Sequence, residues 1–175
     1  SIEHGTLIDD DTARFVAERG AWIVPTMAVI FAVTEQGRQL GFPPASQEKL
    51  KVVFESAIAG LDRMRRAGVK VCYGTDLLGS TYTMQCREFT LRSEVFTPLE
   101  LLRQATSVPA EMMMMDGQIG CIAPGAHADL LLVDGDPLAN LSILRDPKRI
   151  IAVMKDGHFA KQPAVDARRG WERAA

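Results

Sequence analysis

A short valine-rich run that ends in Gly74, Thr75 and Asp76 is the feature that most constrains how this chain can fold. Residues 69–75 predict a strand, because β-branched residues favour extended backbone and the Gly-Thr-Asp segment ends it. Helical patterns lie on both sides, so we expect a parallel β/α arrangement. The carboxyl ends of parallel strands meet at one edge, where functional groups are commonly placed. Asp76 is therefore a candidate functional carboxylate.

The segments before this strand predict an alternation of helix and strand. Residues 12–19 have their apolar positions on one helical face, with acidic residues before them and Gly20 after them. Residues 21–26 are expected to form a buried strand that a proline ends. Residues 37–46 are predicted to be a loop. Apolar residues then recur at helical spacing over residues 47–67, which predicts a long helix.

The region after the strand is less regular. Residues 87–95 are predicted to be helical, whereas the rest of residues 77–96 shows no clear pattern. Residues 97–100 (Thr-Pro-Leu-Glu) form a capping box with proline at the first helical position, so a helix is expected to begin there. Pro109 is expected to end it, and a shorter helix to run through residues 112–115. We interpret the consecutive methionines there as pliable core filler rather than a metal-binding cluster.

The last third of the chain changes from helical to extended periodicity. Residues 119–122, 128–133 and 150–155 predict strands, separated by Pro-Gly, Asp-Gly-Asp-Pro and Asp-Gly turns. We expect a small antiparallel sheet, distinct from the parallel array. Residues 168–175 are expected to be a frayed tail.

Composition excludes several classes of partner. The 20 Lys and Arg residues against 22 Asp and Glu residues give a net charge of -2, so no nucleic-acid interface is expected. The longest apolar run, residues 21–33, is shorter than the ~20 residues that a membrane-spanning helix needs. No signal peptide is visible. The three widely spaced cysteines indicate reduced thiols, and hence a cytoplasmic location.

The start of the chain predicts a fragment. The first residue is Ser1 rather than methionine, and residues 2–5 look like the tail of a strand whose body is absent.

Three segments together resemble the carboxyl-terminal part of the metal-dependent amidohydrolase superfamily. They are residues 2–6 (Ile-Glu-His-Gly-Thr), residues 74–76 (Gly-Thr-Asp) and residues 124–137 (Pro-Gly-Ala-His-Ala-Asp-Leu-Leu-Leu-Val-Asp-Gly-Asp-Pro). Their order and spacing leave room for two β/α units. Within the superfamily, the chain most resembles the imidazolonepropionase-like and Xaa-Pro dipeptidase (prolidase)-like branch. The resemblance extends over residues 1–161.

The resemblance implies an α/β fold. The chain would be the carboxyl-terminal portion of a (β/α)8 TIM-type barrel, namely strands six to eight with their helices, plus part of a small β-sandwich. Residues 1–117 would form the partial barrel, residues 118–161 the sandwich strands and residues 162–175 a tail. Residues 21–26 would be the seventh barrel strand and residues 69–75 the eighth.

The same resemblance implies a metal-dependent site. His4 matches the metal-binding histidine at the end of the sixth strand, and Asp76 matches the catalytic, metal-binding aspartate that follows the eighth. A divalent metal, with zinc expected, suits imidazole nitrogen and carboxylate oxygen. Asp76 would take a proton from the attacking water and pass it to the leaving nitrogen. Thr26, Met27 and Leu77 follow strand ends and are candidate substrate-binding residues by position alone.

The chain also departs from the family pattern. The His-x-His pair of the first strand, the bridging group of the fourth strand and the histidine of the fifth strand have no counterpart here. His4 and Asp76 are fewer than the three protein ligands of an ordinary catalytic zinc site. We therefore expect the site to be incomplete in this chain. A partial barrel also leaves sheet edges and apolar faces uncovered, which predicts self-association or association with the missing amino-terminal part.

Simpler interpretations exist for each candidate. His4 could be a turn residue, and Asp76 could cap the next segment. His127 and His158 are interpreted as structural, and Asp129, Asp134 and Asp136 as turn residues rather than a calcium loop. A buried position is expected for Cys72.

Three functions follow from these alternatives. The first is part of a hydrolase that cleaves carbon–nitrogen bonds in small, dipeptide-like or cyclic amide substrates by metal-activated water. The second is a non-catalytic α/β fragment that acts only in assembly or interaction. The third is a deaminase of the same superfamily.

Overall fold

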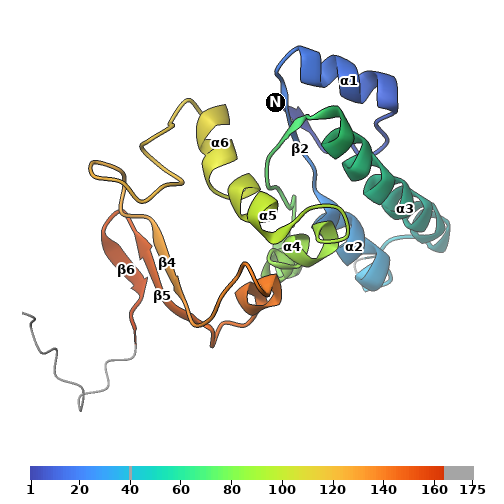
Figure 1. The fold of residues 1–175 in the computed structure, drawn as a ribbon. Helices are drawn as coiled ribbons and strands as arrows, with labels where there is room; N and C mark the ends of the chain where they lie inside the picture. The colour runs from blue at the N-terminus through green and yellow to red at the C-terminus, as the bar shows by residue number, and fades with distance from the viewer. Residues whose placement is uncertain (40, 164–175) are drawn as a thin grey trace, which may run out of the picture.

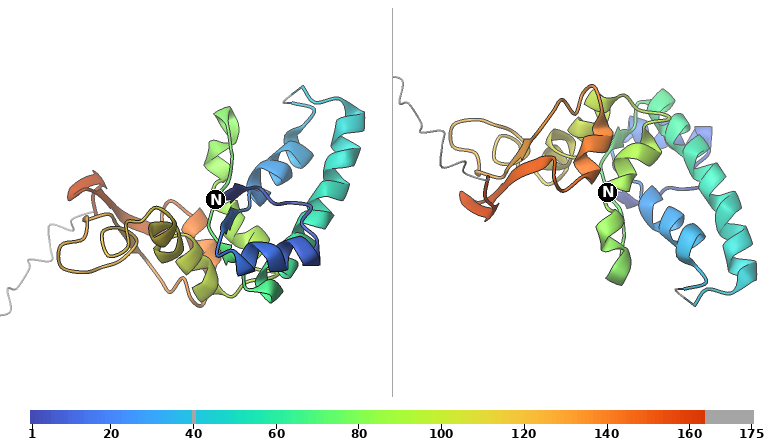
Figure 2. Two further views of the ribbon diagram at one scale, coloured as in Figure 1. Left: turned by 90° about the horizontal axis from the view of Figure 1, so that it is seen from above. Right: turned by 90° about the horizontal axis from the view of Figure 1, so that it is seen from below.

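The computed structural model describes residues 1–39 and 41–163 and has a mixed α/β fold with two three-stranded sheets. The parallel sheet consists of β1 (Ile2–Glu3), β2 (Trp22–Val24) and β3 (Lys70–Val71), and the antiparallel sheet of β4 (Leu130–Val133), β5 (Ile150–Lys155) and β6 (His158–Lys161). Figures 1 and 2 show the antiparallel sheet projecting away from the helices that surround the parallel one. The predicted frayed tail, residues 168–175, lies outside the described residues.

Helix α1 (Asp10–Glu18) begins two residues before the helix predicted over residues 12–19, inside the acidic run. The Asp9 side chain accepts a hydrogen bond of 2.8 Å from the backbone N–H of Thr12, which caps the first turn. Ala13 and Val16 are buried on the inner face. Local sequence chemistry therefore accounts for this helix.

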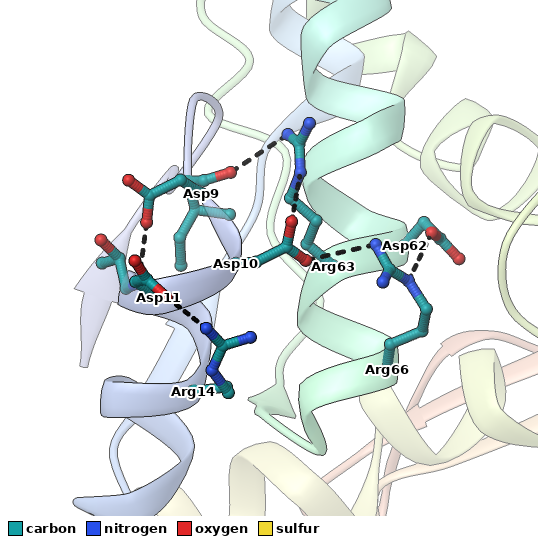
Figure 3. Close-up of polar contacts among 9 residues, drawn as sticks. Asp9, Asp10, Asp11, Arg14, Asp62, Arg63 and Arg66 are labelled. Atoms are coloured by element: carbon teal, nitrogen blue, oxygen red, sulfur yellow. Dashed lines mark hydrogen bonds and ion pairs between the residues drawn. The ribbon is translucent and has the colours of Figure 1, made fainter.

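Ion pairs connect α1 to helix α3 (Pro44–Ala67) (Figure 3). The Arg66 guanidinium lies between two carboxylates, 2.9 Å from Asp62 and 3.3 Å from Asp10. Arg63 approaches Asp10 at 3.8 Å and donates to the carbonyl oxygen of Ile8 at 3.2 Å. Because these side chains are largely exposed, the pairs fix the register of the two helices more than they stabilise them.

Helix α2 (Met27–Gln36) lies in a region for which no helix was expected, directly after the predicted strand. The apolar run divides at Pro25 and Thr26, so that β2 precedes this point and α2 follows it. No side chain from the adjacent sequence caps α2. Instead the Glu88 carboxylate accepts hydrogen bonds from the N–H groups of Met27 and Ala28, at 3.2 and 2.6 Å. A distant residue thus supplies the cap that the local sequence lacks.

Helix α3 begins at Pro44, three residues before the predicted start, so the loop predicted over residues 37–46 is shorter than expected. The reason is that proline suits the first helical position, where its missing N–H costs nothing. The helix ends as predicted at Ala67, followed by Gly68 in the left-handed conformation (φ 73°). Ala57, Leu61 and Met64 bury its inner face.

The parallel sheet has the order β1-β2-β3, with β2 in the middle. Ile23 pairs with Ile2 on one side and with Val71 on the other. The strand predicted over residues 69–75 is regular only at Lys70 and Val71. The N–H of Cys72 still donates to the carbonyl oxygen of Ile23 at 2.9 Å, and the chain then leaves the ladder. One cause is a bond outside the sheet, since the N–H of Tyr73 donates to the carbonyl oxygen of Gln104 at 2.8 Å.

Short helices link the two sheets: η1 (Gly79–Met84), α4 (Arg87–Arg92), α5 (Pro98–Gln104) and α6 (Ser107–Met112). The capping box at the start of α5 is confirmed in both directions, between Thr97 and Glu100. The prediction that Pro109 ends this helix is wrong. The helix ends at Gln104, and Pro109 lies in the first turn of α6, where a backbone N–H needs no helical partner.

The methionine run does not fill a core in this chain. Helix α6 ends at Met112, and the side chains of Met113 and Met114 are 54% and 88% exposed. Met114 has φ 57°, which lies in the left-handed region and ends the helical path. The predicted helix over residues 112–115 and the core-filler interpretation are both wrong here.

The antiparallel sheet contains β4 and β5 near their predicted positions and β6, which was not predicted. The segment between α6 and β4 is irregular, so the strand predicted over residues 119–122 is wrong. Its backbone bonds to turns instead: the N–H groups of Gln118 and Ile119 both donate to the carbonyl oxygen of Met115. The short 3-10 helix η2 (Leu141–Arg145) lies between β4 and β5.

The main core lies between the parallel strands and their helices. It includes Ile23 and Val71 from the strands and Leu61, Phe89 and Leu101 from the helices. Cys72 is buried as expected, and all three cysteines are free. Within residues 1–39 and 41–163, no helix combines the length and the apolar content needed to cross a membrane.

Candidate functional site

The carboxyl ends of β1, β2 and β3 lie at one edge of the parallel sheet, and they carry the residues that the sequence singled out. The N–H of His4 donates to the carbonyl oxygen of Val24, which continues the β1–β2 ladder by one residue. Thr26 follows the end of β2, and Asp76 follows the end of β3. Because the strands are parallel and in register, His4 and Thr26 lie at this edge. Gly74 packs against Val24 and Pro25, so the segment that leads to Asp76 starts from the same edge.

The imidazole of His4 is held by a side chain of the neighbouring strand. Its Nδ1 lies 2.8 Å from the Thr26 hydroxyl oxygen, and the Thr26 side chain is buried. In the tautomer whose Nε2 carries a free lone pair, the proton is on Nδ1 and is donated to Thr26. Metal-binding histidines commonly use their second ring nitrogen in this way. Thr26 therefore holds the ring of His4 in place, and in this tautomer Nε2 is available to a ligand.

The carboxylate of Asp76 is exposed and makes no hydrogen bond to any other described residue. Its backbone has φ 50°. His4, with φ 66°, shares this left-handed conformation, which among the described non-glycine residues is found otherwise only at Met114 and Asp156. Such conformations cost free energy and occur often at functional sites. Two of these few residues are thus the two predicted metal ligands.

Gly74 sets how closely the end of β3 approaches the end of β2. A Cβ at this position would lie 2.5 Å from Cγ1 of Val24 and 3.3 Å from the carbonyl oxygen of Pro25. Glycine is therefore required by close packing between the two strand ends. Any side chain here would move the segment that carries Asp76.

The other predicted site residues are placed differently. Met27 is 2% exposed and belongs to the core, where its N–H donates to Glu88. Leu77 directly follows Asp76 and is half-buried. His127 and His158 lie at the turn of the antiparallel sheet, where their Nδ1 atoms contact Asp156 at 3.3 and 2.9 Å. Asp129 and Asp136 accept backbone hydrogen bonds in turns, as predicted.

A buried ion pair lies directly behind this edge and was not predicted. Glu88 and Arg92 of α4 have fully buried side chains and contact each other at 2.5 Å. Arg92 donates to the carbonyl oxygens of Pro25 and Cys72, at 2.5 and 2.9 Å, and to Oε1 of Gln104 at 3.0 Å. Burial raises the pKa of the Glu88 carboxyl, and Arg92 together with two backbone N–H groups opposes that shift. The only signal in the sequence was the i,i+4 spacing of Glu88 and Arg92, which ordinarily indicates an exposed pair.

The donor chemistry at the edge suits a divalent cation, because an imidazole nitrogen and a free carboxylate are both suitable ligands. However, the described part of the chain contains no group of three or more His, Cys, Asp or Glu side chains placed to hold a metal ion. His4 and Asp76 thus remain the two predicted ligands at this edge, and neither belongs to such a group among the described residues.

An apolar groove of about 780 Å³ lies elsewhere in the molecule, between the antiparallel sheet and helices α4 and α5. It is lined by Phe89, Leu102, Leu130 and Leu131, among others, and by none of the predicted site residues. The site edge and this groove are thus separate features.

The chain is similar to known proteins by family model, by sequence and by structure. Residues 1–160 match the model of the amidohydrolase family. The chain is 26% identical over 166 residues to ochratoxinase of Aspergillus niger, covering 94% of this chain and 34% of that protein. It is 30% identical over 145 residues to imidazolonepropionase of Ralstonia nicotianae, covering 78% of this chain and 34% of that protein.

A solved structure is similar over nearly the same range. The crystal structure of a prolidase complexed with N-methylphosphonate-L-proline superposes with a TM-score of 0.87 at 41% identity, covering 92% of this chain and 40% of that one. This chain spans about a third of the length of the two curated relatives, 34% in each case.

Proposed function

The chain belongs to the amidohydrolase family, and from that premise we propose that its protein is a metal-dependent hydrolase that cleaves carbon–nitrogen bonds in small peptide-like or cyclic amides. The observation that supports this most directly is the placement of His4 and Asp76. Both lie at the carboxyl edge of one parallel sheet, and Thr26 holds the imidazole of His4 at 2.8 Å. In α/β proteins this edge is where reacting groups are usually placed.

The fold that we propose for the whole protein is a (β/α)8 barrel with a small β-sandwich. Strands β1, β2 and β3 would be its sixth, seventh and eighth barrel strands, and β4 to β6 would belong to the sandwich. The prolidase structure, 40% of which this chain covers, supports this assignment. The division at residues 117 and 118 falls between α6 and β4, and it remains a prediction.

His4 and Asp76 would hold the cation, for which zinc is our proposal. A divalent cation at this edge would polarise the scissile carbonyl and lower the pKa of the attacking water. Asp76 accepts the proton of that water on a carboxylate oxygen and donates it to the leaving nitrogen. His4 would hold the cation through Nε2, in the tautomer whose Nδ1 donates to Thr26. Leu77, next to Asp76 and half-buried, is the candidate for apolar contact with substrate.

The substrate proposal is a dipeptide or a cyclic amide. Two similar proteins support it: the prolidase complexed with N-methylphosphonate-L-proline and the imidazolonepropionase relative. A cytoplasmic location remains the prediction from the three free cysteines.

A second candidate is a non-catalytic α/β unit that acts in assembly. The observation that favours it is that the described residues contribute only two of the three or more ligands of a metal site. A single experiment separates the two candidates. Purified full-length protein is analysed for bound zinc and assayed on dipeptides and cyclic amides, and ammonia release is measured to detect deamination.

The decisive variant is Asp76→Asn. Asparagine tolerates the left-handed conformation of this position, so the change removes charge and proton transfer without adding strain. We expect hydrolysis to fall by at least about 100-fold, the order that general acid–base catalysis contributes. Asp156→Asn is the matched control, because Asp156 has φ 49° and lies in a turn of the other sheet. Absence of both bound zinc and hydrolysis in the wild type would favour the assembly candidate, whereas equal hydrolysis by wild type and Asp76→Asn would contradict the catalytic role of Asp76.

A further inference from the structure

The Arg92 side chain connects the two strand ends that carry the site. It comes from α4, is fully buried, and reaches the carbonyl oxygens of Pro25 and Cys72 with different nitrogens of one planar guanidinium. Pro25 directly follows β2, and Cys72 directly follows β3. Both carbonyls belong to residues that have just left the strands, where ladder bonds no longer fix them. The guanidinium replaces those bonds at the point where the site begins.

The side chains that contact Arg92 also fix the backbone near these two strand ends. Glu88 balances its charge and accepts the first two N–H groups of α2, so it fixes the residues that immediately follow Thr26. Gln104 accepts from Arg92 through its side chain and from the N–H of Tyr73 through its backbone carbonyl. Among the described residues, the side chains of Glu88 and Arg92 thus make polar contacts only with residues 25–28 and 72–73, apart from each other and Gln104 of α5.

Stability alone does not explain a fully buried ion pair. Removing two charges from water costs about as much as their attraction returns, and well-packed apolar residues commonly stabilise a core as much or more. A guanidinium, in contrast, presents donors in a rigid plane and fixes the separation of the groups that it bridges. The arrangement therefore favours precise geometry over stability.

We propose that Arg92 is a positioning residue, whose guanidinium sets the separation of the β2 and β3 ends and so places Asp76 relative to His4 and Thr26. The proposal rests on the proposed function for its catalytic consequence. It makes no claim that Arg92 touches substrate, since its side chain is fully buried.

The test uses the full-length, zinc-loaded protein and two variants. Arg92→Met together with Glu88→Gln removes both charges, so that neither remains buried alone. Arg92→Lys keeps the charge but replaces the planar fork by a single point donor. Leu61→Ala, which opens a cavity at the buried face of α3 and removes no contact of Arg92, is the control for general destabilisation.

Four quantities are measured at a temperature where all variants are folded by circular dichroism. Zinc affinity is obtained by competition with a chelator, kcat and KM from steady-state hydrolysis, and amide hydrogen exchange from peptides covering residues 24–28 and 72–78. In both Arg92 variants we expect zinc affinity and kcat to fall by about 10-fold or more, as for other residues that orient metal ligands. KM should change by less than about threefold, because substrate contacts remain.

Hydrogen exchange distinguishes positioning from general loosening. In the Arg92 variants the two strand-end peptides should lose protection while residues 50–64 of α3 keep it, and Leu61→Ala should show the reverse. If Arg92→Lys has wild-type zinc affinity, kcat and exchange, the bridging role is wrong. The same conclusion follows if both Arg92 variants change no more than Leu61→Ala.

The exchange measurement also separates this inference from the proposed function. If the wild-type protein neither binds zinc nor hydrolyses amides, the proposed function fails. The selective loss of protection at residues 24–28 and 72–78 would still support Arg92 as the group that sets the strand ends. Unchanged exchange in those peptides would overturn it.

Discussion

The Nδ1 atom of His4 lies 2.8 Å from the hydroxyl oxygen of Thr26, and this contact joins the ends of two adjacent parallel strands. It holds the ring of a histidine at an exposed strand end, and Nε2 of that ring has no hydrogen bond to another described residue. The same contact gives Thr26 a role different from the substrate contact predicted by position, because its side chain is 6% exposed.

We predict that Thr26→Val weakens metal binding. Valine keeps the shape and removes the hydroxyl, so the imidazole of His4 loses the hydrogen-bond partner that holds its ring in place. The expected loss of zinc affinity is about 10- to 100-fold, measured by chelator competition on the full-length protein. Thr26→Ser, which keeps the oxygen, is the matched control and should stay near wild type. Equal affinities of the valine and serine variants would contradict the orienting role.

Association is predicted from the uncovered apolar residues of both sheets. Ile2 in the edge strand β1 is 43% exposed, and Leu131 and Leu132 in β4 are 61% and 56% exposed. Unpaired edges and apolar faces favour contact with another polypeptide. We expect sedimentation of the 175-residue chain at micromolar concentration to show species larger than a monomer. Leu131→Lys together with Leu132→Glu should shift the distribution toward monomer, and a clean monomer for the unaltered chain would refute the prediction.

Acid should loosen the antiparallel sheet through Asp129. Hydrogen bonds from the Lys155 ammonium and from the N–H of Asp156 lower the pKa of this carboxyl below its usual 3.8. A carboxyl with a depressed pKa in the folded state contributes stability above its unfolded value, and this contribution is lost as the pH falls through the folded value. Between about pH 5 and pH 2, the wild type should therefore lose more thermal stability than Asp129→Asn.

The matching control is Asp116→Asn, because the Asp116 side chain is exposed and makes no hydrogen bond to another described residue. Its melting temperature should follow the wild type at every pH. The melting temperature of Asp129→Asn should lie below the wild type near neutral pH and approach it in acid. Parallel curves for wild type and Asp129→Asn would contradict the assignment.

Elements whose signals are local could be predicted from the sequence. The capping box of Thr97 and Glu100, and the helix end at Gly68, are both confirmed, because each depends on residues a few positions apart. Helix α2 could not be predicted in the same way. Its cap comes from Glu88, which is 60 residues away from the Ala28 amide whose hydrogen bond it accepts, so the decisive contact exists only after folding.

The same distinction between local signals and distant contacts applies to the candidate site. Placing His4 and Asp76 at strand ends followed from pattern and resemblance, whereas the partners that hold these ends did not. Arg92 is 67 residues from Pro25, and its charge predicts an exposed surface residue rather than a buried bridge. The prediction for the methionines was wrong for the opposite reason. Their apolar composition predicted burial, but Met114 is 88% exposed just after the end of helix α6.

The last prediction compares two glycines that are needed for different physical reasons. Gly68 has φ 73°, and a methyl group there would meet no atom within 4 Å, so alanine adds only backbone strain. Gly74 has no such φ, but a methyl group there would lie 2.5 Å from Cγ1 of Val24. Gly68→Ala should therefore lower the free energy of unfolding by about 1–2 kcal/mol and leave zinc affinity unchanged.

Gly74→Ala should behave differently, since a methyl group would clash with Cγ1 of Val24 and crowd the carbonyl oxygen of Pro25, which favours movement of the end of β3 away from β2. That movement displaces Asp76 relative to His4, so zinc affinity should fall even at temperatures where the protein stays folded. Urea unfolding and chelator competition on both variants provide the comparison. If the two alanine variants lose stability alike and neither loses affinity, close packing at Gly74 does not control the site.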